Sequence, residues 1–132
     1  MRGAGPAAFS VEPDLAIAID TTLCVDTPGV PEDERVTQQG KGVGIKIMDS
    51  SVIGNRALID ELAGVAKKNK IPYQLSVLPK GGNDASAIQR TRGGIRTVTL
   101  AIPTRYIHTV TECIHKTDLK AAIDLLAAFL KA

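Results

Sequence analysis

Four short apolar runs, separated by stretches with helical periodicity, constrain the fold of this chain more than any other feature. Runs that are apolar throughout or at every second position predict strands at Leu15–Thr21, Val43–Met48, Tyr73–Leu78 and Arg96–Ile102. Apolar residues at helical spacing predict helices over Arg56–Asn69, Ala85–Arg92 and Asp118–Leu130. Strands that alternate with helices indicate an α/β protein, for which we expect an α/β/α layered arrangement around a mixed, mostly parallel sheet.

The ends of these elements are predicted from residues that cap or interrupt regular structure. Asn55 and Thr117 precede helices and are expected to be their N-caps. Pro103 is expected to stop the last strand, because proline lacks a backbone donor. The first ten residues are small and contain Gly and Pro, which predicts an irregular N-terminal segment or the end of a broken element. The last helix carries an apolar stripe, made of Leu119, Ala122, Ile123, Leu126, Phe129 and Leu130.

Length and composition indicate one ordinary domain without a signal for nucleic acid or membrane binding. The 132 residues carry a net charge of only +2, and two Phe, two Tyr and no Trp leave few rings to stack on bases. No apolar run reaches the roughly 20 residues of a membrane span, and the N-terminus lacks the apolar segment of a signal peptide. A reducing cytoplasm is therefore the expected location, with Cys24 and Cys113 as free thiols.

Asp20 and His108 are the strongest candidates for chemistry. Each lies just past an apolar run, and ligands gather at the carboxyl ends of strands in α/β sheets. A carboxylate and an imidazole delivered there suit a zinc-like metal site. A cap or an ion pair with an arginine such as Arg105 is the alternative for Asp20, and a surface or hydrogen-bonded role is the alternative for His108. Two ligands do not complete a metal site, and the sequence offers no obvious third.

A glycine-rich turn, Gly81-Gly82-Asn83-Asp84-Ala85, precedes the second predicted helix. Its backbone amides could approach a ligand at the N-terminus of that helix. The same residues suit a tight turn in which Asn83 or Asp84 caps the helix, and the isolated sequence favours this cap. The run Gly40–Gly44 is not a phosphate-binding loop, because it lacks the required order and leads into a strand.

Seven short segments resemble, in the same order, those of one enzyme family. They are Ala18-Ile19-Asp20, Asp26-Thr27-Pro28-Gly29, Val36-Thr37-Gln38 with Gly40-Lys41-Gly42, Ile45-Lys46-Ile47-Met48-Asp49, Ile71-Pro72-Tyr73-Gln74, Gly81-Gly82-Asn83-Asp84-Ala85 and Arg105-Tyr106-Ile107-His108. The pattern is similar to that of the dinuclear-metal aminopeptidases of the tetrahedral (TET) type, or glutamyl aminopeptidases, some of which are named CelM-type cellulases or endoglucanases. The resemblance covers essentially the whole chain.

This resemblance implies an activity and a site. Family members release N-terminal residues from peptides with two divalent metal ions, zinc or cobalt, and form homo-oligomers. Asp20 would bind one ion and His108 the other. The residues that would bind the peptide substrate are Gly81, Gly82, Asn83, Asp84, Arg105 and Tyr106. Asn83 and Ser86 stand where relatives usually carry Thr and Gly, which separates this loop from the family pattern.

The resemblance also implies that part of the catalytic apparatus lies outside this sequence. In relatives a histidine, a metal-bridging aspartate and a Glu-Glu pair precede an Arg-Gly-Ala segment, which Arg2-Gly3-Ala4 resembles. The first glutamate of the pair is the general base, which is therefore expected upstream of Met1. Residues 1–132 are expected to form a single, partial catalytic domain that lacks the inserted dimerisation domain. Without the base and the bridging carboxylate, this chain is expected to be inactive alone.

Two other functions stay open. A non-catalytic binding or assembly module could keep the fold and lose the site. A glycosidase would need a carboxylate pair at a set separation across a sugar, and no such pair is recognisable among the carboxylates.

Overall fold

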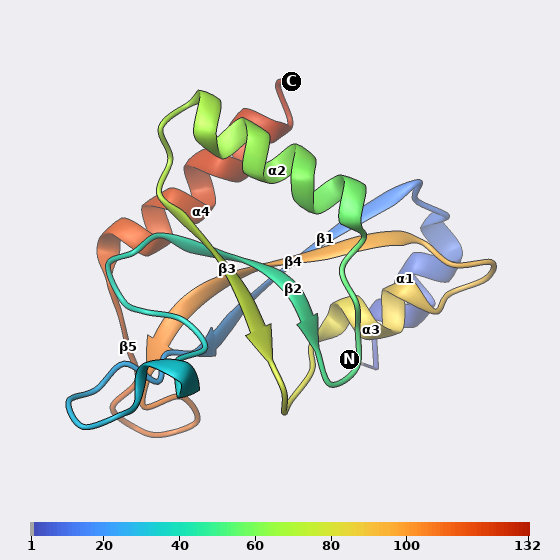
Figure 1. Cartoon of the computed structure of the whole chain (residues 1–132). Helices are drawn as coiled ribbons and strands as arrows, with labels where there is room; N and C mark the ends of the chain where they lie inside the picture. Colours follow the sequence, from blue (N-terminus) through green and yellow to red (C-terminus); the bar gives the residue numbers. More distant parts are fainter. Residues whose placement is uncertain (1) are drawn as a thin grey trace.

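The computed structural model describes residues 2–132 and has a central sheet between two helical layers (Figure 1). Along the chain the elements are α1 (Ala4–Val11), β1 (Leu15–Leu23), the 3-10 helix η1 (Glu32–Glu34), β2 (Val43–Asp49), α2 (Arg56–Lys68), β3 (Tyr73–Leu78), α3 (Asp84–Gln89), β4 (Arg96–Arg105), β5 (Cys113–Ile114) and α4 (Lys116–Phe129). Helices α2 and α4 cover one face of the sheet, whereas α1 and α3 lie on the other. The predicted α/β layered fold is confirmed.

The sheet is mixed, with the strand order β1-β4-β2-β3 and the short β5 beside β4. β1 is parallel to β4, and β2 is parallel to β3. β2 and β4 run antiparallel in the middle, as do β4 and β5. Because β1 and β4 are parallel neighbours, their carboxyl ends lie at the same end of the sheet. This is the end that carries the residues following both strands.

The main core lies between the sheet and the pair α2 and α4. The amphipathic α2 buries Leu58 and Leu62 completely, and α4 does the same with Leu125, against Ile45 and Leu100 of the sheet. Full burial of each such side chain contributes about 1.5–3 kcal/mol, so this layer supplies much of the stability. Asn55 caps α2 as predicted, because its side chain accepts a hydrogen bond from the Leu58 amide at 3.1 Å.

On the opposite face, one arginine joins α1 to the segment after α3. Arg92 donates two hydrogen bonds to the Phe9 carbonyl, at 3.0 and 2.8 Å, and its guanidinium lies 3.8 Å from the centre of the Phe9 ring. It also forms an ion pair of 2.7 Å with Glu12. Together these contacts hold the N-terminal helix against α3.

Several predicted boundaries are wrong, among them the end of α3, which lies at Gln89 and not at Arg92. Residues 4–11 form α1 and not an irregular segment. β4 continues through Pro103 to Arg105, because β2 is in register with β4 only as far as Ala101, and proline is tolerated where one side of a strand is no longer paired. His115, not Thr117, is the N-cap of α4, and its ring accepts a hydrogen bond from the Thr117 amide.

The predicted apolar stripe of α4 is only partly covered. Ala122 is buried, but Leu119, Ile123 and Leu130 are 38%, 59% and 73% exposed. Sequence periodicity locates an apolar face on a helix, but it does not say whether an element of the same chain covers it.

The two cysteines are free thiols, as expected, with Cys24 buried and Cys113 exposed. Among the described residues, no helix is both long enough and apolar enough to span a membrane.

Candidate functional site

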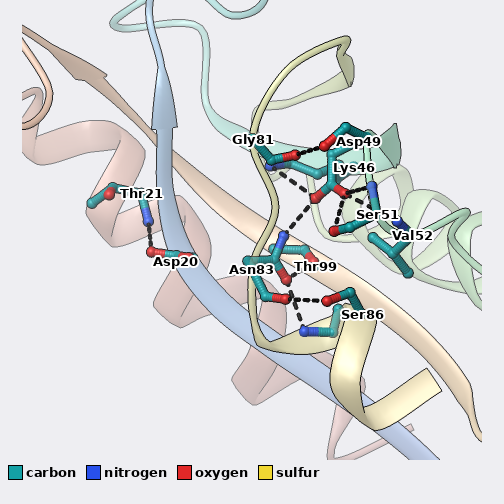
Figure 2. Close-up of polar contacts among 12 residues, drawn as sticks. Asp20, Thr21, Lys46, Asp49, Ser51, Val52, Gly81, Asn83, Ser86 and Thr99 are labelled. Carbon is teal, nitrogen blue, oxygen red and sulfur yellow. Dashed lines mark hydrogen bonds and ion pairs between the residues drawn. The ribbon is translucent and has the colours of Figure 1, made fainter. Parts of the chain in front are cut away.

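Asp20 lies near the carboxyl end of β1, beside small residues of the neighbouring strands. It is in register with Ala101 of β4, which in turn pairs with Gly44 of β2. Its carboxylate is exposed and accepts a hydrogen bond of 2.8 Å from the adjacent Thr21 amide (Figure 2). The alternative ion pair with Arg105 is wrong, since Arg105 binds another carboxylate.

A cavity of about 330 Å³ brings Asp20 together with a second predicted site residue, Asp84. Asp84 opens α3, directly after the glycine-rich turn, and is exposed. The remaining lining comes from apolar residues of α1, β1 and α3: Ala4, Ile17, Ala18, Ile19 and Ile88. Two carboxylates in a partly apolar hollow favour a cationic ligand, such as a metal ion or an ammonium group.

Asn83 holds the glycine-rich turn to the sheet through a buried network (Figure 2). Its side-chain oxygen accepts hydrogen bonds from the Ala85 amide at 2.9 Å and from the Thr99 hydroxyl at 3.0 Å. Its Nδ2 donates to Asp49 at 2.9 Å. The side chain is only 4% exposed, so its polar atoms are engaged within the chain. The predicted helix cap is confirmed in Asn83, and its predicted contact with substrate stays a prediction.

The two glycines of the turn permit a close approach to the segment that follows β2. The Gly81 carbonyl accepts hydrogen bonds from the amide and the hydroxyl of Ser50, at 3.2 and 2.6 Å, while its φ of +93° suits glycine. A Cβ at Gly82 would lie 2.2 Å from the Ser51 Oγ. The backbone of the turn is therefore fixed by the loop 50–51, and both glycines keep their substrate-binding role as a prediction.

Lys46 on β2 is a further candidate functional residue that the sequence analysis did not single out, because its charged side chain is buried. Lys46 is 3% exposed, and its Nζ lies 3.8 Å from the Asp49 carboxylate. Burial lowers the pKa of Lys46, while the charges of Asp49 and Asp20 act in the opposite direction. The alternation over Val43–Met48 marks Lys46 only as polar, and the turn before α3 lies over it in the folded chain (Figure 2). The lysine thus places a positive charge near the Asp20 side of the sheet.

Arg105 ends β4 in a two-pronged contact with Asp26. Its Nε and Nη2 donate to the two Asp26 oxygens at 2.7 and 3.0 Å. The guanidinium lowers the pKa of Asp26 to about 2. Burial, followed by the hydrogen bond with Asp26, raises the pKa of Cys24 to about 12. Because Arg105 is oriented by Asp26, it braces the start of the following loop, and its predicted contact with substrate stays a prediction.

Tyr106 and His108 lie in the exposed loop after β4 and not in the cavity with Asp20 and Asp84. Both have left-handed backbone conformations, with φ of +57° and +64°, which are unusual for residues other than glycine. The His108 amide donates to the Glu112 carboxylate, and the Thr109 amide donates to the Tyr106 carbonyl at 3.1 Å. These contacts fix the loop while its two rings face solvent.

Residues 2–132 do not by themselves make a complete metal site. Among residues 2–132, no three His, Cys, Asp or Glu side chains are grouped so that they could hold an ion, whereas three protein ligands are typical of catalytic zinc. Two buried hydroxyls on the Asp20 side of the sheet, those of Thr22 and Ser76, have no hydrogen-bond partner within this part of the chain. The roles of Asp20 and His108 as metal ligands therefore stay predictions.

The predicted position of the general base lies outside the described residues, as does Met1. The structure describes the chain from Arg2 onward. The position of the base relative to Asp20 and His108 stays a prediction.

Comparisons with known proteins point to one family. The sequence model of the M42 glutamyl aminopeptidase family matches residues 1–125. A putative aminopeptidase of Acetivibrio thermocellus is 43% identical over 126 residues, which are 96% of this chain and 38% of the relative. The structure superposes on a TET aminopeptidase from a marine sediment archaeon of the Thaumarchaeota with a TM-score of 0.95 and 38% identity, covering 98% of this chain and 36% of that one. For the TET1 peptidase of Pyrococcus horikoshii, which can assemble into a tetrahedron or a large octahedral shell, the TM-score is 0.80 and the identity 34%, over 96% and 36% of the two chains. The chain thus spans little more than a third of the length of these relatives.

Proposed function

We propose, from the premise that the chain belongs to the M42 glutamyl aminopeptidase family, that it contributes to a metal-dependent site that releases N-terminal residues from peptides. The observation that carries this proposal is the exposed Asp20 carboxylate at the cavity it shares with Asp84. Two divalent ions, zinc or cobalt, would supply a water activated for attack on the peptide bond. In this proposal Asp20 ligates one ion and His108 the other.

The residues around Asp20 suit a peptide N-terminus. Asp84 lies in the same cavity, and its negative charge would attract the substrate α-ammonium group. Ala18 and Ile88 add apolar lining beside this pair. Gly81, Gly82 and Asn83 would set the position of Asp84, because the buried Asn83 anchors the turn that carries it.

The proposed site is completed only together with further polypeptide. One carboxylate and one imidazole are too few ligands for a catalytic centre of this kind, and the described residues hold no group of three possible metal ligands. We therefore propose that this chain is inactive alone. We further propose assembly into homo-oligomers, by similarity to the TET1 peptidase, and a reducing cytoplasm as its location, which suits two free cysteines.

A non-catalytic assembly module is the second candidate. It is favoured by the same observation that limits the first, the lack of a three-ligand cluster among the described residues. The two candidates differ in what Asp20 does, because only a catalytic role requires its carboxylate.

The test measures metal content and hydrolysis of chromogenic aminoacyl substrates, with and without added zinc or cobalt. The chain alone should show neither tight metal binding nor turnover. Coexpressed with the part of the Acetivibrio thermocellus relative that lies outside the match, it should show turnover that Asp20→Asn and His108→Asn abolish. Asp14→Asn is the control, since Asp14 is an exposed carboxylate that does not line the cavity. Turnover by the chain alone would contradict the proposal, and full activity of Asp20→Asn in the combination would favour the assembly module.

A further inference from the structure

The loop 106–112, which carries His108, is bounded by two residues that pair with each other. Arg105 is the last residue of β4 and Cys113 is the first residue of β5, and the two are in register in the antiparallel pair. Within the loop, the His108 amide donates to the Glu112 carboxylate. Because the loop is closed at its base, the contacts that hold Arg105 and Cys113 also determine where His108 lies.

Asp26, in the loop after β1, is connected to both ends of this loop (Figure 1). Its carboxylate accepts two hydrogen bonds from Arg105, at 2.7 and 3.0 Å, and one from the Gln39 amide at 2.9 Å. The Gln39 side chain in turn donates to the Cys113 carbonyl at 2.6 Å. The Asp26 side chain is only 8% exposed, which strengthens these charge-assisted hydrogen bonds. Asp26 and Gln39 thus form a clamp on the base of the loop.

The segment that carries Gln39 is itself fixed to two other elements. The fully buried Asp118 of α4 accepts hydrogen bonds from the amides of Gly40 and Gly42, at 2.7 and 2.8 Å. The Gln74 side chain of β3 donates to the Gly42 carbonyl at 2.9 Å. Because α4 and β3 both hold this segment, Gln39 has little freedom to follow a movement of the loop, and the loop is held in place by Gln39.

We propose that Asp26 is a positioning residue for His108, which acts through Arg105 and Gln39 on the two ends of the loop 106–112. The backbone at His108 has a φ of +64°, and such a conformation persists only where surrounding contacts hold it. The inference rests on the proposed function, in which the His108 imidazole binds a metal ion. A ligand on a loop binds well only when its support keeps it in place, so Asp26 would matter to the site without contacting it.

Nitrogen-15 relaxation of the labelled chain tests the clamp without metal or substrate. The His108 amide should have an order parameter of about 0.85 in the wild type. Asp26→Asn removes the charge and one acceptor, and Gln39→Ala removes the contact at the other end of the loop. Each variant should lower the His108 order parameter toward about 0.6. His115, which caps α4 outside the loop, should keep its wild-type value in both variants. Asn55→Ala, which removes the cap of α2, controls for a general loss of stability and should leave both histidines unchanged.

The zinc dependence of turnover separates positioning from stability alone. In the chain coexpressed with the Acetivibrio thermocellus polypeptide, Asp26→Asn should raise the zinc concentration for half-maximal turnover by roughly ten- to a hundredfold, as loss of a residue that supports a metal ligand does. Saturating zinc should restore most of the turnover, because the imidazole is still present. Gln39→Ala should shift the zinc concentration in the same direction, whereas Asn55→Ala should leave it at the wild-type value.

The proposal is overturned if His108 stays ordered in both clamp variants or if Asn55→Ala loosens it equally. It is also overturned if the order is lost while the zinc dependence stays that of the wild type. A wild-type combination without turnover, or turnover that survives His108→Asn, would instead contradict the proposed function. In that case the order parameters, which need no activity, would still decide whether Asp26 positions His108.

Discussion

Asn83 and Asp49 are joined by a buried hydrogen bond of 2.9 Å, from the amide nitrogen of the first to the carboxylate of the second. Asp49 also accepts from Ser51 and Val52, so a single carboxylate organises the end of β2 and the loop after it. Through Asn83 the same hydrogen-bond network also fixes the turn that carries Asp84. The position of Asp84 beside Asp20 thus depends on a network that contains neither residue.

Asn83→Ala should destabilise the protein by about 2–4 kcal/mol, because it removes the N-cap of α3 and one buried hydrogen bond each from Asp49 and Thr99. Urea unfolding followed by circular dichroism measures this loss. Asn55→Ala is the control, since it removes only a cap and should cost about 1 kcal/mol. Equal losses in the two variants would show that the buried network adds nothing to the cap.

The sequence predicted the layers of this fold because periodicity depends on burial, and burial is strongest here between the sheet and α2 and α4. It was less informative about the face that carries Asp20. Alternation marks Lys46 as polar, but whether that face is exposed depends on α3 and its turn, which only the topology brings there. The uncovered part of the α4 stripe has the same origin, because amphipathicity does not identify the element that covers it.

The sequence predicted individual residues of the candidate site, each from its own strand, but not which of them lie together. Asp20 and His108 were found because each follows an apolar run, but their neighbours depend on long-range pairing. That Asp84 shares a cavity with Asp20 follows from the crossing of α3 over β1, which no local pattern encodes. The pair of Arg105 and Asp26 likewise joins the end of β4 to the loop after β1, which is distant from it in sequence.

Acid should weaken the contact between Arg105 and Asp26. The pKa of Asp26 is about 2 in the folded chain, below the roughly 3.9 of an unfolded aspartate. The ion pair therefore contributes stability that is fully present above about pH 4–5 and is lost as the pH falls toward 2. Urea unfolding between pH 2 and 7 should show Asp26→Asn less stable than the wild type at pH 7 and nearly equal to it at pH 2. Asp60→Asn, which removes an exposed pair with Arg56, should change stability by less than about 1 kcal/mol at either pH. A constant difference for Asp26→Asn would exclude the ion pair as its cause.

The two thiols should react at very different rates. Burial raises the pKa of Cys24 to about 12, so at pH 8 this thiol is protonated as well as inaccessible. The exposed Cys113 should react with a disulfide reagent within the mixing phase, and Cys24 only after denaturation. Cys113→Ser should remove the fast phase and leave the slow one. Two fast thiols in the native protein would contradict the burial of Cys24.

The left-handed backbone conformation at His108 should determine how stable its variants are, whatever chemistry the imidazole ring performs. With φ at +64°, the residue occupies the left-handed region, which asparagine tolerates and β-branched residues avoid. His108→Val should therefore be less stable than His108→Asn by about 1 kcal/mol in urea unfolding, although both remove an exposed imidazole. Tyr106, with φ at +57°, should show the same order for valine and asparagine. Equal stabilities at both positions would mean that the loop relaxes to another conformation in solution. If the order holds, His108→Asn is the variant that tests the imidazole alone, because it removes the ring and keeps the backbone that presents it.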